Sequence, residues 1–202
     1  YIPFLKYENL STNLTYLNLE LSPISLIYMT KQNTLFHKEQ LMRFDKLTAK
    51  FQQALANGQS LALAADNSYL EAAHVLKALL DDRDSGMTAL LAHAGINVQN
   101  VQQALQQTLA SLPKVSGQGG EILPSRELQA IFNLMDKAAT KRGDAYIASE
   151  LFPLAAVQQN DTIGKILKNA GASEHNLNTA INAIRGGATV DNPNAEDQRE
   201  AL

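Results

Sequence analysis

Few side chains in this 202-residue sequence have the types and spacing that catalysis or ligand binding requires. The stretch DTIGKIL has a Gly-Lys pair, Gly164-Lys165, as phosphate-binding loops do. However, Ile166 stands where such a loop needs a magnesium-binding serine or threonine, and no glycine lies five residues before Gly164. The stretch GQGG at 117–120 lacks the third glycine of a dinucleotide-binding fingerprint. Neither stretch predicts nucleotide binding.

Metal and acid–base chemistry have no better candidates. Asp82, Asp84 and Gly86 resemble the start of a calcium loop, but His93 stands where the closing glutamate would be. The histidines lie in separate segments without metal-ligand spacing, and no pair of carboxylates has the placement of an acid–base couple. His74, in an apolar helical segment, is predicted to be a hydrogen-bonded group of the core. We expect no metal, no cofactor and no catalytic activity in this chain.

Composition excludes several partners. A net charge of −3 leaves no basic surface for nucleic acid, so we expect none to bind. No apolar stretch approaches the roughly 20 residues that cross a membrane, so we expect no membrane association. The chain has no cysteine, which fits a reducing bacterial cytoplasm. Its richness in alanine, leucine and glutamine favours helices over strands.

The hydrophobic pattern is helical from Phe44 onward, with apolar residues at steps of three and four. Glycines, prolines and capping residues divide it into helical segments. We predict helices over 44–62, 71–80, 87–94, 98–112, 126–142, 150–159, 162–170 and 174–185, capped where they follow Asn97, Ser125, Ser149, Asp161 and Ser173. Gly95 and Gly171 are predicted to end helices in the left-handed conformation.

The same pattern occurs twice. Tyr69 corresponds to Tyr146, 77 residues later, and Gly95 corresponds to Gly171 after a one-residue deletion. We therefore predict an all-α fold in which two pseudo-symmetric four-helix repeats form one compact domain. The repeats would span about 44–112 and 125–187, joined by a Pro/Gly connector at 113–124 and followed by a polar linker at 188–202.

Residues 1–41 differ in composition from the rest. They are rich in tyrosine, asparagine and leucine and have neither a clean period nor helix caps. Lys38-Glu39 can be encoded by the bases of a bacterial ribosome-binding site, a suitable distance before Met42. We expect this leader to be translated upstream sequence, poorly ordered, with the native protein starting at Met42.

Several blocks resemble the N-terminal domain of ClpB-type AAA+ protein disaggregases, over Met42–Leu202. They are MRFDKLTAKFQQALANGQSLALAADNSYLEAAHVLKALL, LPKVSGQGGEILPSRELQ, DKAATKRGDAYIASELF, ILKNAGAS and NAEDQREAL. The resemblance implies a domain that captures unfolded or aggregated polypeptide and passes it to ATPase modules beyond Leu202. ATP and magnesium would bind only those modules. It also implies a monomeric fragment of a protein that is hexameric and cooperates with a DnaK-type chaperone.

The resemblance also implies which residues contact the polypeptide. They are Thr48, Leu134, Asp144, Glu150 and Leu151. From the pattern alone, Leu134 lies off the apolar stripe of its helix and is predicted to be exposed. Asp144 would lie in a turn, and Glu150 in the first turn of a helix, where a negative charge is favourable. A groove between the two halves would bring Thr48 close to Asp144 and Glu150.

One alternative remains open at this point. Clp protease ATPase subunits have an N-domain with the same double repeat, which docks adaptors or substrates. Those domains generally differ from this sequence in the connector VSGQGGEILPS and in the exit AEDQ.

Overall fold

The computed structural model describes residues 44–115 and 122–200. The predicted leader, 1–41, lies outside the described residues, as do the middle of the connector and the last two residues. None of the described helices is long and apolar enough to cross a membrane.

The first half of the described chain contains four α-helices. Its elements are η1 (Phe44–Lys46), α2 (Ala49–Ala64), β1 (Tyr69–Leu70), α3 (Ala72–Asp81), η2 (Arg83–Ser85), α4 (Met87–His93) and α5 (Val98–Ala110). The first long helix begins at Ala49 and not at Phe44 as predicted, because the Thr48 hydroxyl accepts a hydrogen bond from the Phe51 amide, 3.4 Å away. Asn97 caps α5, as predicted.

The second half of the described chain contains five α-helices. Its elements are β2 (Leu123–Pro124), α6 (Arg126–Arg142), α7 (Leu151–Gln159), α8 (Thr162–Asn169), α9 (Glu174–Arg185) and α10 (Ala195–Glu200). Ser125 and Ser173 cap α6 and α9, as predicted. One predicted cap is wrong, because Ser149 lies two residues before α7 and bonds Glu196 instead. Asp161 is the N-cap residue of α8, as predicted, but its side chain makes no capping bond.

The predicted all-α class is confirmed, since the two strands contain only two residues each. They pair in parallel, with Tyr69 opposite Leu123 and Leu70 opposite Pro124. A further parallel bridge joins Leu47 to Ile147. The 77-residue offset relates the bridge of Leu70 with Pro124 to this second one. That the halves are two copies of one fold stays a prediction.

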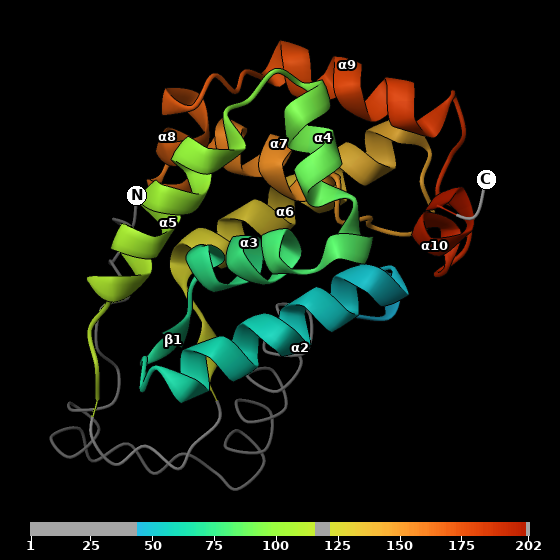
Figure 1. Ribbon diagram of the computed structural model, residues 1–202. Helices are drawn as coiled ribbons and strands as arrows, with labels where there is room; N and C mark the ends of the chain where they lie inside the picture. The colour runs from blue at the N-terminus through green and yellow to red at the C-terminus, as the bar shows by residue number, and fades with distance from the viewer. Residues whose placement is uncertain (1–43, 116–121, 201–202) are drawn as a thin grey trace, which may run out of the picture. The chain divides into compact units, whose positions relative to one another are not determined.

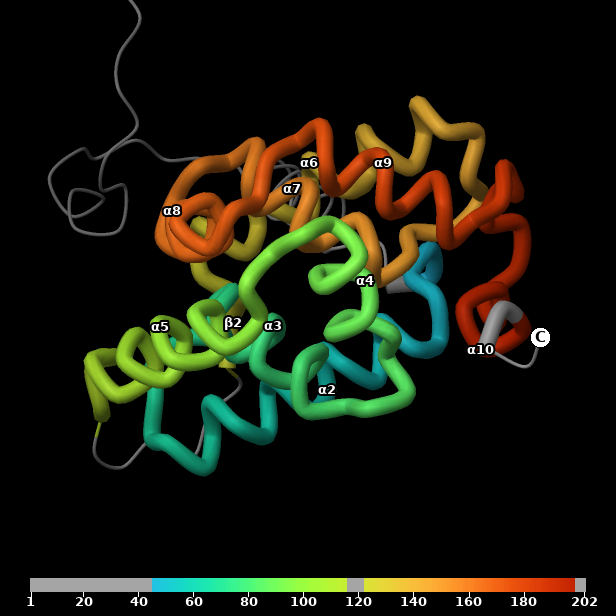
Figure 2. Tube along the Cα trace, turned by 45° about the horizontal axis from the view of Figure 1, so that its top comes forward, coloured from blue at the N-terminus to red at the C-terminus, as the bar shows by residue number. Residues whose placement is uncertain are grey.

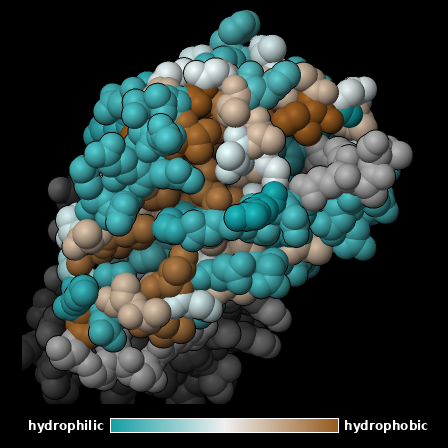
Figure 3. Space-filling view, viewed as in Figure 1, coloured by the Kyte–Doolittle hydropathy of each residue, from teal (hydrophilic) through white to brown (hydrophobic). Residues whose placement is uncertain are grey.

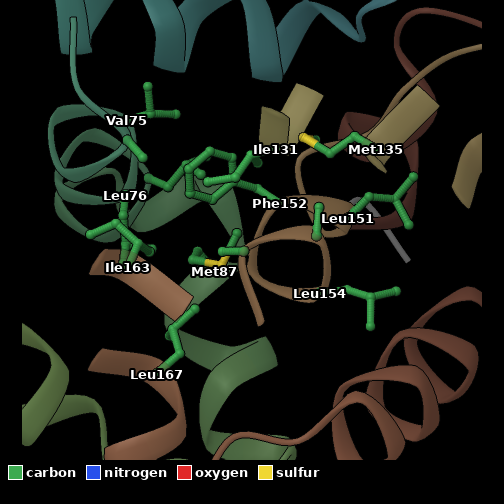
Figure 4. Close-up of a cluster of buried hydrophobic side chains, with 14 of the residues drawn as sticks. Val75, Leu76, Met87, Ile131, Met135, Leu151, Phe152, Leu154, Ile163 and Leu167 are labelled. Carbon is green, nitrogen blue, oxygen red and sulfur yellow. The ribbon is translucent and has the colours of Figure 1, made fainter. Parts of the chain in front are cut away.

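Helices α3 and α7 lie in the interior, as Figure 1 shows. Seven of the nine residues of α7 and eight of the ten residues of α3 are buried, which is typical of helices that are apolar on all sides. Phe51 of α2 contacts Phe132 of α6 and Phe152 of α7, with ring centroids 5.6 and 6.2 Å apart. Figure 4 shows the buried cluster to which Phe152 belongs. This cluster contains residues from both halves, which therefore share a core.

The two predicted helix corners contact each other. Gly95 and Gly171 have positive φ values of 74° and 105°, as predicted for the ends of α4 and α8. The Asn97 amide donates to the Ala170 carbonyl at 2.9 Å. Together with the packing of α4 on α9, visible in Figure 2, this contact joins the halves on a second side.

The predicted linker is partly packed on the domain. Val190 and Ala195 are buried in a small cluster with Ala148 and Tyr146, separate from the main core. Glu196 is also buried. Figures 1 and 2 show α10 beside the start of α2. Two apolar side chains and one carboxylate thus hold 190–196 on the domain, and the role of 188–202 as a polar linker stays a prediction.

Candidate polypeptide-binding site

Two of the predicted site residues, Asp144 and Glu150, share one buried cation. Arg185, the last residue of α9, places Nη1 2.7 and 3.0 Å from the two carboxylate oxygens of Asp144 and Nε 2.9 Å from Glu150 Oε1. The three side chains are 4, 0 and 9% exposed, in the order Arg185, Asp144, Glu150. Asp144 also accepts a hydrogen bond from the Val190 amide.

The positive charge of Arg185 and the negative charges of Asp144 and Glu150 stabilise one another. Burial alone would lower the pKa of Arg185, but the neighbouring carboxylates of Glu150 and Asp144 outweigh it and raise that pKa. Arg185 is therefore a permanent cation. Its Nη2 atom is buried and has no hydrogen-bond partner among the described residues.

Glu196 lies on the other side of Glu150. Its Oε1 accepts hydrogen bonds from the Thr48 hydroxyl and from the Ser149 amide, 3.0 Å away, and its Oε2 accepts from the Ser149 hydroxyl. Burial raises the pKa of Glu196, and the negative charge of Glu150 raises it further. These three donors, two hydroxyls and one amide, carry no charge.

The structure brings together three of the residues that the sequence selected. The Thr48 amide donates to the Ile147 carbonyl at 3.1 Å, and Glu196 and Ser149 connect Thr48 to Glu150. The link from Thr48 to Glu150 is therefore indirect, and Arg185 connects Glu150 to Asp144. All three side chains are buried and hydrogen-bonded within the chain. Their contact with a polypeptide stays a prediction.

The two predicted leucines occupy different positions. Leu134 is half-buried and packs against the main core, so the prediction of exposure is only partly correct. Leu151 is completely buried, next to Met135 in Figure 4. This side chain belongs to the core because α7 is apolar on all sides, and its contact with a polypeptide stays a prediction.

Two members of the cluster, Arg185 and Glu196, were missed in the sequence. Each had a local signal: an arginine directly before the helix-ending Gly186, and a glutamate that follows an isolated alanine in the family-like block NAEDQREAL. Their partners lie 35 to 148 residues away, and residue spacing alone does not predict such contacts.

Accessible apolar side chains lie elsewhere. Tyr69 and Leu123, directly opposite each other in β1 and β2, are 52 and 57% exposed. Leu63, near the end of α2, is 49% exposed. On the face seen in Figure 1, apolar patches lie between stretches of polar surface (Figure 3). The adjacent pair on the strands offers an apolar contact to another chain.

The described residues contain no group of three histidine, cysteine or acidic side chains able to hold a metal ion. His74 is a core group, as predicted. Its Nδ1 accepts from the Glu71 amide and its Nε2 donates to Asn67 Oδ1, both at 3.0 Å. Burial lowers the pKa of His74, so the neutral ring is favoured.

Comparison with known families matches residues 46–183 to the Clp repeat (R) N-terminal domain. The chain is 45% identical over 161 residues to the chaperone protein ClpB of Vibrio cholerae, a match that covers 80% of this chain and 19% of that protein. The ClpB of Pseudomonas putida is 40% identical over the same length and with the same coverage. The chain thus spans about a fifth of the length of these curated relatives.

Solved structures share the fold. The N-terminal domain of Hsp104 from Candida albicans has a TM-score of 0.66 at 23% identity and covers 75% of this chain and 99% of that one. A complex of the ClpV N-domain with a VipB peptide has a TM-score of 0.57 at 23% identity, covering 71% and 89%.

Proposed function

Because this chain belongs to the family of Clp repeat N-terminal domains, we propose that it binds unfolded or aggregated polypeptide as the N-terminal domain of a ClpB-type disaggregase. The observation that carries the proposal is the 45% identity to ClpB over 161 residues, which make up 80% of this chain.

The surface offers a suitable contact. An unfolded polypeptide displays apolar side chains that folding would bury, and these bind exposed apolar groups without a fixed sequence. Tyr69 and Leu123 form such a contact, and Leu134 is half-exposed. A contact of so few side chains is weak, as is required of a domain that must release its client. Four of the predicted site residues are buried, and they contact a polypeptide only after a rearrangement that exposes them. They are Thr48, Asp144, Glu150 and Leu151.

Other properties are proposed for the whole protein. The captured polypeptide would pass to ATPase modules that bind ATP and magnesium, in a hexamer that cooperates with a DnaK-type chaperone in the bacterial cytoplasm. We propose that the domain itself is monomeric, uses no cofactor and does not bind nucleic acid.

The fold is compatible with peptide binding, since the ClpV N-domain of the same fold was solved with a VipB peptide. Adaptor docking on a Clp protease ATPase is less well supported. The relatives at 40–45% identity are ClpB proteins, whereas the N-terminal domain of ClpD from Arabidopsis thaliana shares only 22% identity. An adaptor-docking domain would ignore unfolded chains, which separates the two functions experimentally.

The test is a double substitution on the exposed strands. Tyr69→Ser with Leu123→Ser removes both apolar side chains, and we expect the affinity for reduced, carboxymethylated lactalbumin to fall about tenfold. Fluorescence anisotropy of the labelled polypeptide measures this affinity. Ile184→Ser, on α9 and 43% exposed, is the control and should leave binding unchanged. Equal binding by the double variant, or an equal loss in the control, would contradict the proposed surface.

A further inference from the structure

Residues 188–198, which include the start of α10, are bound to the domain largely through their main-chain groups. The Val190 carbonyl accepts hydrogen bonds from the amides of Ala145 and Tyr146, at 2.8 and 3.1 Å, and the Pro193 carbonyl accepts from the Ala49 amide at 2.8 Å. The Val190 amide donates to Asp144 at 3.0 Å. The segment therefore uses main-chain groups on both sides of the polar cluster.

Few side chains of this segment are buried, and Asp197 also pairs with Lys50 of α2, 3.6 Å away. Only Val190, Ala195 and Glu196 are buried among its residues. The two apolar ones lie in a small cluster outside the main core. Gly186 and Gly187, both at positive φ, connect the segment to α9. Segments with little buried apolar area open at a low free-energy cost, so this one can separate while the core stays folded.

Separation would expose a set of unpaired main-chain donors. The amides of Ala49, Ala145, Tyr146 and Ser149 all donate to residues 190–196, and the hydroxyls of Thr48 and Ser149 donate to Glu196. Free amides of this kind pair with the carbonyl groups of another extended chain, whatever its sequence. Unfolded polypeptides carry such carbonyls along their whole length.

We propose that residues 188–198 form a releasable strap that occupies this surface in the same molecule, so that the strap and an unfolded polypeptide bind there in turn. The proposal rests on the proposed function and adds a mode of regulation to it. It explains how Thr48, Asp144 and Glu150 take part in client binding although their side chains are buried while the strap is bound. The captured chain replaces the strap and inherits its main-chain hydrogen bonds.

The key variant is Glu196→Ala, which removes the carboxylate that Thr48 and Ser149 hold. Hydrogen exchange at the amides of Ala49, Ala145 and Tyr146 reports strap opening directly, because these amides donate to strap carbonyls. We expect their exchange to accelerate about tenfold, with little change in the core helices. Binding of reduced, carboxymethylated lactalbumin should tighten several-fold because the competing segment is released.

Two further variants complete the test, one as a control and one as a second way to weaken the strap. Asp191→Ala removes the same charge from an exposed strap position and should leave both exchange and binding unchanged. Val190→Ala weakens the strap at its apolar anchor and should act in the same direction as Glu196→Ala, which keeps the test decisive if that variant folds poorly.

The outcomes separate the strap from the client function. If the full chain binds the unfolded polypeptide but neither strap variant changes exchange or affinity, the strap proposal is overturned and the proposed function stands. If no form binds the polypeptide, the proposed function fails and with it the competition.

A synthetic peptide of residues 188–200, added to Glu196→Ala, then decides whether this surface binds extended segments. Restored protection at Ala49 and Ala145 would support that, and unchanged exchange would refute it.

Discussion

At the scale of single residues, Arg185 is a buried charge that pairs with two carboxylates. Two buried carboxylates, Asp144 and Glu150, depend on it for their neutralisation. Removing one partner of a buried ion pair leaves an uncompensated charge in a poorly hydrated site, which costs more than the pair itself contributes.

We therefore expect Arg185→Met to lower the free energy of unfolding by about 3–5 kcal/mol. The matched control is Arg142→Met on α6, because Arg142 is half-buried and its hydrogen bonds within the described chain go to the neutral side chains of Asn178 and Asn182. That change should cost about 1 kcal/mol. Urea unfolding of both variants measures the difference, and an equal loss would show that the buried cation has no special role.

The lowered pKa of His74 makes the stability of the fold depend on pH, in a direction that can be derived. Burial lowers its pKa in the folded state, whereas the pKa of a histidine in an unfolded chain is about 6.5. Below that pH the unfolded chain binds a proton that the folded chain rejects, so stability is complete above it and decreases as the pH falls. Glutamine can accept the Glu71 amide in its place, as in a capping box, but does not titrate.

His74→Gln should therefore lose less stability than the natural chain when the pH falls from about 7 to 5. Thermal unfolding at several pH values measures this slope. Comparing variants cancels the contributions of Glu127 and Glu196, whose pKa values burial raises in both proteins. His93→Gln, at an exposed position, is the control, and an equal change there would contradict the assignment.

At the scale of helices, one glycine determines how α7 and α8 pack. Gly164 belongs to the stretch whose Gly-Lys pair superficially suggests phosphate binding, but its role in the structure is close packing. A Cβ added at Gly164 would overlap the carbonyl oxygen of Ala156 in α7, and a backbone atom cannot yield as a side chain can.

Gly164→Ala should consequently destabilise the domain by about 2–3 kcal/mol, although alanine is the better helix former. Gly58 in α2 provides the comparison, since its added Cβ would lie 3.3 Å from main-chain atoms of His74 and Val75. Gly58→Ala should cost less. A smaller loss at Gly164 than at Gly58, measured by thermal unfolding, would mean that α8 moves freely on α7.

The helices were largely predictable, and the reason is local. Caps such as Asn97, Ser125 and Ser173 bond amides three residues away, so the signal and its effect lie in one turn of sequence. Thr48 and Ser149 show the limit. Both bond Glu196, so a distant carboxylate decides what their hydroxyls do. The resemblance placed both Asp144 and Glu150 at the site, but Arg185 and the burial of the cluster depend on tertiary contacts.

At the scale of the whole molecule, the described chain combines a stable interior with a weakly held segment. The main core contains residues of both halves, and Phe51 joins α2 to α6 and α7. Residues 188–198 are held mainly by hydrogen bonds and a small separate cluster. A domain that captures and releases polypeptide needs such a difference in stability between its interior and its binding surface.

An NMR titration of the isotopically labelled full chain with reduced, carboxymethylated lactalbumin tests this account most directly. We predict weak, progressive shifts at Tyr69, Leu123 and Leu134, together with shifts of the Ala49 and Ala145 amide signals as their hydrogen bonds pass from the strap to the client. No perturbation at client concentrations of about 1 mM, where even weak binding is detected, would contradict polypeptide binding by this domain. Perturbation confined to other surfaces would contradict the site.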